Sequence, residues 1–243
     1  MEELINKYQS DEIKQSDEAE ERFSQGLNSA SNSVEICAGN YSAYLDQLAD
    51  LFEYPDEDYF NKIDAFSKQL GMLDKGARKK IEEFLSRIKG FSIDEIQEVY
   101  TATYDLSPVC SLNIGIHLFG EEDYKRGNFM AALKSAYERN NFSCGNELPD
   151  FLPYMVKYLL VADETERREL IGYCLLNALE KMISLLDEKN PYHWLLSGVY
   201  LILKGICPEK YELTLNSKNG DYSYGCREFC NRVLNWNEPD NRY

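Results

Sequence analysis

Nine apolar residues recur at helical spacing between residues 170 and 186, and they constrain the fold more than any other feature of the sequence. They are Leu170, Ile171, Cys174, Leu175, Ala178, Leu179, Met182, Ile183 and Leu186. An apolar stripe this wide is not covered by a single neighbour. The pattern therefore predicts a central helix that packs against two or three other helices.

The same helical period recurs on both sides of this segment. Ser92, followed three residues later by Glu95, predicts a capping box at the start of one helix, and Pro191 suits the first turn of another. No strand alternation of similar strength occurs before residue 206, so we predict an all-α fold, a single globular helical bundle. The expected helices fall at 45–52, 60–66, 81–88, 92–104, 124–140, 170–186 and 191–205.

We expect the chain to divide into three parts. Residues 1–36 form an acidic, polar N-terminal extension with a linker-like end, residues 37–205 form the helical domain, and residues 206–243 form a C-terminal tail. Within the tail, Asn219-Gly220 between alternating residues favours a small β-hairpin, although an extended tail fits equally well. Residues 226–234 suit a last short helix.

Charge limits the choice of partner. The chain has 42 acidic and 26 basic residues, a net charge of −16, and it shows no basic block that offsets this locally. Such a surface repels phosphate backbones, so we expect no nucleic-acid partner, whereas a cationic peptide is attracted. The longest apolar stretch, 194–206, is too short and too interrupted for stable membrane insertion.

The N-terminus and the cysteines point to the cytoplasm. The first residues have neither the basic nor the apolar region of a secretory signal. The seven cysteines are scattered and odd in number, which is typical of reduced thiols rather than of a disulfide framework.

The residue types that common enzymes need are sparse. His117 and His193 are the two histidines, neither lies in a nucleophile motif, and we interpret both as structural. Cys207, Cys226 and Cys230 lack the usual spacing of a zinc site. No phosphate-binding glycine loop occurs. The sequence therefore predicts a protein that is not an enzyme and that has no cofactor and no metal.

The run Glu147-Leu148-Pro149-Asp150 precedes a predicted helix that begins near Pro153. Pro153 fits a first helical turn, and Asp150 is placed to cap the free amides of that turn. Negative charge at Glu147 is stabilised beside the same helix end. From physics alone, this run is first of all a helix-start device.

Together with its neighbours, this run resembles a known family. In order, the chain contains Tyr104-Asp105, Ser111-Leu112 with His117-Leu118-Phe119, Arg126-Gly127 with Met130, and the segment from Glu147 to Pro153. This order is similar to that of the delta-subunit (NarJ-type) chaperones of respiratory nitrate reductases, within the wider TorD/DmsD group of redox-enzyme maturation proteins. The run from Leu51 to Asp56 resembles the family's early helix end, while Phe151 replaces the His that the family commonly has.

The resemblance implies a cytosolic, system-specific assembly chaperone. Members bind the N-terminal, twin-arginine-like leader of the catalytic subunit of a molybdopterin oxidoreductase and assist insertion of its molybdenum cofactor. An acidic helical protein with an apolar groove suits such a basic, amphipathic leader. The candidate peptide-binding residues are Tyr104, Leu118, Phe119, Arg126, Glu147, Asp150 and Tyr154.

Two other functions stay open. One is a carboxylate-metal hydrolase within a helical bundle, which requires stoichiometric bound metal that elemental analysis detects. The other is an acidic helical scaffold that binds a folded protein, for which cross-links would map to surface acids outside residues 100–155. The client oxidoreductase and the oligomeric state are also open.

Overall fold

The computed structural model describes residues 42–69, 71, 74–106 and 108–207. The chain divides between Glu35 and Ile36 into two units, and all of these residues belong to the second. The predicted N-terminal extension, the predicted hairpin and the predicted short helix at 226–234 lie outside the described residues.

Every regular element in the described ranges is a helix, which confirms the all-α prediction. The one β-type pairing within these ranges is an isolated antiparallel bridge between Asn113 and Phe151. The helices are α2 (Ser42–Asp50), α3 (Tyr59–Ser67), α4 (Lys75–Ile88), α5 (Ile93–Tyr104), α6 (Ile114–Phe119), α7 (Tyr124–Arg139), α8 (Leu152–Tyr158), α9 (Glu164–Glu169), a π-helical segment (Leu170–Leu175), α10 (Leu176–Leu185) and α11 (Pro191–Ile206).

The predicted central helix exists, and all nine residues of its apolar stripe are buried. Its first part is not α-helical as expected, because residues 170–175 adopt π geometry before α10 begins. Asn177 is buried beside this segment, and its Nδ2 donates to the carbonyl oxygen of Tyr173 at 2.8 Å. A π segment releases carbonyl groups from the regular ladder, so this amide compensates for the irregularity.

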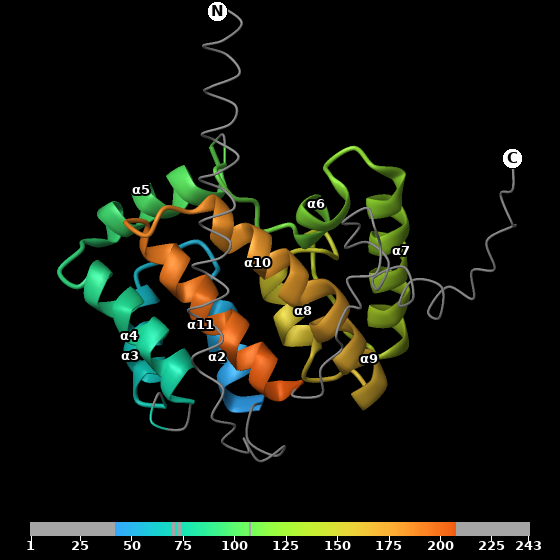
Figure 1. Cartoon of the computed structure of the whole chain (residues 1–243), viewed down its shortest axis with the longest axis horizontal. Coiled ribbons are helices and arrows are strands. Elements are labelled where there is room, and N and C mark those ends of the chain that lie inside the picture. The colour runs from blue at the N-terminus through green and yellow to red at the C-terminus, as the bar shows by residue number, and fades with distance from the viewer. Residues whose placement is uncertain (1–41, 70, 72–73, 107, 208–243) are drawn as a thin grey trace, which may run out of the picture. The chain divides into compact units, whose positions relative to one another are not determined.

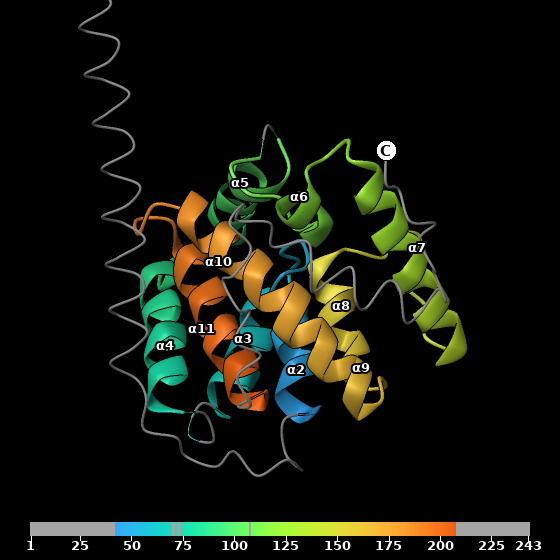
Figure 2. The same ribbon diagram turned by 45° about the vertical axis from the view of Figure 1, so that its right-hand side comes forward.

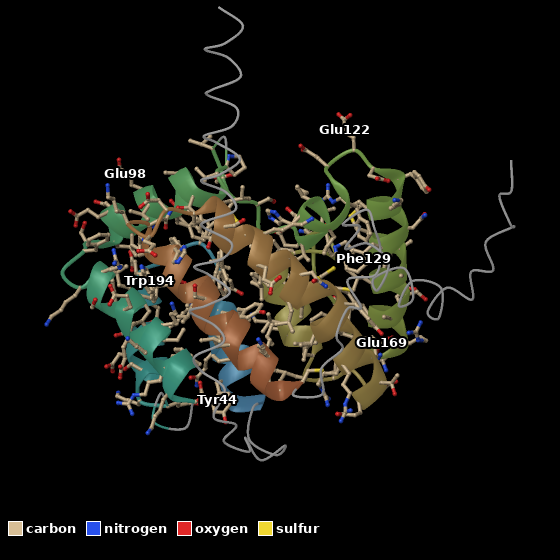
Figure 3. The ribbon with its side chains drawn as sticks, in the orientation of Figure 1. Tyr44, Glu98, Glu122, Phe129, Glu169 and Trp194 are labelled. Carbon is tan, nitrogen blue, oxygen red and sulfur yellow. The ribbon has the colours of Figure 1, made fainter. Side chains whose placement is uncertain are left out.

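Helix α11 lies between α4 and α10 in both views (Figures 1 and 2) and contacts both. Helices α2 and α8, which pack on each other, lie behind this layer in the view of Figure 1. Helix α7 packs on α6. Figure 3 shows Phe129 projecting inward from α7, where it is fully buried. The core thus forms where the apolar faces of these helices meet.

Two of the predicted helix starts are confirmed. The Ser92 side chain accepts from the amide of Glu95, and the Glu95 carboxylate accepts in return from the amide of Ser92. Pro191 occupies the first turn of α11, with Asn190 as the capping residue. None of the helices in the described ranges is long and apolar enough to cross a membrane.

Candidate functional site

Asp150 does not cap α8, so that part of the prediction is wrong. The capping position of α8 is Phe151, which makes no side-chain capping bond, while Pro153 does lie in the first turn. Asp150 is fully buried. A buried carboxylate needs donors around it, and the helix that follows in sequence does not provide them.

The donors come instead from α6, α7 and the residue before α6. The Asp150 carboxylate accepts from the Arg126 Nε at 2.9 Å, from the Gly115 amide at 3.2 Å and from the Asn113 Nδ2 at 3.2 Å. A Cβ atom on Gly115 would lie 2.6 Å from the Asp150 Oδ2, so only glycine lets this carboxylate approach. We call Asp150, Arg126, Gly115 and Asn113 the carboxylate clamp.

The clamp ties the start of α8 to α6. The Asp150 carbonyl accepts from the Ile114 amide at 2.8 Å, and the Leu152 amide donates to the Leu112 carbonyl at 2.9 Å. Motifs that lie 24 to 37 residues apart in sequence are thereby held together. Arg126 and Asp150, which come from two of the predicted motifs, are therefore brought together, but they stabilise the interior and do not form an exposed binding site.

The seven candidate residues differ in their access to solvent. Glu147 is exposed, Phe119 and Tyr154 are half-buried, and the Arg126 side chain is only 11% exposed. Asp150, Leu118 and Tyr104 are buried. The hydroxyl of Tyr104 is buried without a hydrogen-bond partner, and burial raises its pKa. Contact with a peptide, which stays a prediction, is thus open first to Glu147, Tyr154 and Phe119.

Tyrosine rings connect the early chain to α5. The Tyr54 ring, 53% exposed, meets the Tyr100 ring edge-on with 5.4 Å between centroids. Tyr100 in turn packs against Tyr104 and Tyr192, and its hydroxyl donates to the Phe52 carbonyl at 3.0 Å. Aromatic side chains of this kind supply both packing and contact area.

Acidic side chains gather around Tyr100. Burial is the main cause of its raised pKa, and the carboxylates of Asp105, Glu147 and Glu53 add to it. Glu53 also bonds Lys157 of α8, whose ammonium lies 5.9 Å from the centroid of the Tyr154 ring. We call the partly exposed residues Asp50, Glu53, Tyr54, Glu147 and Tyr154 the acidic-aromatic face.

Sequence reasoning did not select Asp50, Glu53, Tyr54 or Lys157 as site residues. The run Leu51–Asp56, interpreted above only as a resemblance, contains Glu53 and Tyr54 and could have pointed to both. Asp50 lies just before this run. Lys157 gave no signal, because the carboxylates that bind it lie about a hundred positions earlier in the chain. Exposed apolar side chains at Leu106, Val109 and Leu148 add hydrophobic surface on two loops.

Helix α4 carries positive charge that the overall composition hides. Residues 75–89 contain six Lys or Arg and two Glu, a net charge of +4, so the prediction of no basic block needs this correction. Trp194, labelled in Figure 3, lies beside it, with the Lys80 Nζ 4.6 Å and the Arg87 Cζ 5.0 Å from its ring. The adjoining open hollow of about 390 Å³ is lined by Arg87, Asp187, Glu188 and Lys189. Its charges balance, so they select no class of ligand.

Both histidines are held as structural residues. The His117 Nε2 lies 2.7 Å from the Ser111 carbonyl oxygen, and the His193 Nδ1 lies 3.0 Å from that of Leu186. Because a carbonyl oxygen only accepts, each of these two ring nitrogens carries a proton. Burial lowers the pKa of both histidines.

Acidification is therefore expected to destabilise the protein. A histidine whose pKa is lower in the folded than in the unfolded state binds its proton more readily when unfolded, so stability falls as pH drops through about 6.5. Urea unfolding at a series of pH values measures this slope. The His117→Gln and His193→Gln double variant should flatten it, and an unchanged slope would contradict this reading of the histidines.

Two of the described cysteines, Cys110 and Cys144, form no disulfide. Both are free thiols, and burial raises the pKa of Cys110 to about 12. Within the described ranges no group of three metal-ligating side chains occurs. The pair Cys226 and Cys230 lies outside those ranges, so elemental analysis stays the test of the metal hypothesis.

Comparison with known proteins gives one informative similarity. No family model matches the chain. The chain is similar to the "Probable nitrate reductase molybdenum cofactor assembly chaperone NarJ" of Bacillus subtilis (strain 168), with 26% identity over 163 residues. The aligned part covers 65% of this chain and 87% of that relative. This similarity agrees with the NarJ-type resemblance of the motifs, whereas membership in the wider TorD/DmsD group stays a prediction.

Proposed function

We propose that this protein is a cytoplasmic, non-enzymatic assembly chaperone for a molybdenum-containing oxidoreductase. In this role it binds the basic N-terminal leader of the catalytic subunit and assists cofactor insertion before the subunit is released. The similarity to a probable NarJ chaperone over most of that relative's length is the observation that carries the proposal.

The acidic-aromatic face is the surface that suits such a leader best. Glu147 and Glu53 offer carboxylates, and the exposed ring of Tyr54 and the half-buried ring of Tyr154 offer apolar area. A twin-arginine-like leader combines cationic and apolar side chains. Carboxylates bind guanidinium groups strongly, and tyrosine rings stack on them. The acidic-aromatic face thus complements both the cationic and the apolar side chains of the leader.

The carboxylate clamp has a separate role in this proposal. Asp150 and Arg126 satisfy each other inside the protein, so neither charge is free for the leader. They act as positioning residues, since they fix the loop that carries Glu147 relative to α6 and α7. The carboxylates of Glu53 and Glu147 on the acidic-aromatic face, rather than that of Asp150, then attract the leader's arginines.

Titration calorimetry with a synthetic leader peptide tests the proposal. The peptide is the N-terminal segment of the molybdoenzyme catalytic subunit from the same organism. We expect binding that weakens as salt rises, and a Glu53→Gln, Glu147→Gln double variant should bind about tenfold more weakly, equivalent to about 1.4 kcal/mol. Glu122→Gln, on the exposed loop before α7 (Figure 3), is the matched control. No binding by the unmodified protein would overturn the proposal.

A further inference from the structure

Lys157 occupies a small cation-binding box on the acidic-aromatic face. Its ammonium nitrogen lies 2.7 Å from the Asp50 Oδ1 and 2.9 Å from the Glu53 Oε1. The Tyr154 ring, one helical turn earlier on α8, has its centroid 5.9 Å from the same nitrogen. Two carboxylates and the face of an aromatic ring are the groups that bind organic cations in proteins.

We propose that Lys157 is an internal substitute for a basic side chain of the partner, and that an arginine of the leader displaces it from the Asp50–Glu53–Tyr154 box. This inference rests on the proposed function and gives it a contact and a form of regulation. The lysine keeps the box filled while no leader is bound. A peptide must therefore bind the box more strongly than Lys157 does, and weakly basic peptides fail to displace the lysine.

The chemistry favours arginine over the resident lysine. A planar guanidinium binds carboxylates through several donors at once and stacks on a tyrosine ring, whereas an ammonium acts as a compact point charge. Both carboxylates stay available to the newcomer, because their other cationic neighbour, Lys62, pairs with Asp56 at 2.9 Å. Once Lys157 leaves, the box loses one positive charge and is more negative.

The box is also accessible. The side chains of Lys157, Asp50 and Glu53 are 22%, 31% and 41% exposed, so a solvated partner reaches them without unfolding the protein. Partly exposed ion pairs contribute little to stability, and the four-carbon stem of lysine lets the ammonium swing into water. Burial works to lower the pKa of Lys157, but Asp50 and Glu53 outweigh it and raise that pKa. The lysine therefore stays charged at neutral pH and competes for the box there.

Lys157→Met is the decisive variant, because it keeps the apolar stem against Tyr154 and removes the charge. In titration calorimetry with the leader peptide, it should bind about tenfold more tightly than the unmodified protein and lose affinity more steeply as salt rises. Lys157→Arg should bind more weakly, because the resident cation then holds the box better. Lys134→Met, an exposed lysine on α7, is the matched control and should leave the affinity unchanged.

The design separates failure of this inference from failure of the proposed function. If the unmodified protein fails to bind the peptide, the proposed function is wrong, whatever Lys157→Met does. If the unmodified protein binds and Lys157→Met, folded by circular dichroism, binds equally or less tightly, the displacement is wrong. A gain that persists when Asp50→Asn and Glu53→Gln are added to Lys157→Met, or when both peptide arginines are changed to Gln, also overturns it.

Discussion

Asp150→Ala is expected to lower the free energy of unfolding by about 3–5 kcal/mol, because it leaves one half of a buried ion pair without its partner. The Arg126 side chain, 11% exposed, would lose the carboxylate that lies 2.9 Å from its Nε. The Gly115 amide would lose its acceptor at the same time. Equilibrium urea unfolding followed by circular dichroism measures the change.

Two comparisons make this prediction specific to the carboxylate clamp. Glu147→Ala removes an exposed carboxylate three positions away and should change stability by no more than about 0.5 kcal/mol. Because Asp150 and Arg126 contact each other, the Asp150→Asn, Arg126→Met double variant should lose less stability than the sum of the two single losses. An Asp150→Ala loss as small as that of Glu147→Ala, or fully additive losses, would show that the clamp does not stabilise the fold.

Gly198→Ala is expected to lower the free energy of unfolding by about 1–3 kcal/mol through overpacking. Gly198 lies where α11 crosses α4, and a Cβ atom there would lie 2.3 Å from the Cδ1 and 2.8 Å from the Cγ1 of Ile81. Ile81 is fully buried, so its side chain has no free space to take. The clash outweighs the gain of about 1 kcal/mol that alanine normally brings to a helix interior.

Gly127→Ala provides the matched control for helix propensity. Gly127 lies in α7, it is exposed, and a Cβ atom there meets nothing within 4 Å. This variant should therefore gain up to about 1 kcal/mol. Ile81→Val, which removes the Cδ1 atom, should recover part of the Gly198→Ala loss. If Ile81→Val only adds its own cost of about 0.5–1.5 kcal/mol, the clash at this crossing is not the cause.

The E-L-P-D run shows how far sequence reasoning reached at the candidate site. It located the start of α8 correctly, since Pro153 lies in the first turn. It misassigned Asp150, because a capping bond is a local interaction that neighbouring residues predict, whereas the donors that hold this carboxylate come from residues 24 to 37 positions earlier. Nothing in the spacing of the run distinguishes these two outcomes.

The acidic-aromatic face was predicted only in part for the same reason. Glu147 and Tyr154 were selected from the motif region. Asp50 and Glu53, and the Lys157 side chain that they bind, were not selected, because an ion pair between partners about a hundred residues apart leaves no periodic signal. The partners of such a pair meet only when α2 and α8 pack against each other.

By itself, the sequence determined the longer helices, their order and most of their buried faces, because helical period, capping residues and prolines act within a few residues of one another. It also determined the net charge, from which we predict a cationic partner. It did not predict the short helix α6. Only the tertiary structure decided which charges face solvent and which satisfy each other inside, and where the central helix departs from regular geometry. Those outcomes depend on contacts between helices that are distant in the chain. A buried polar group is satisfied only when the helices that carry its partners are packed around it.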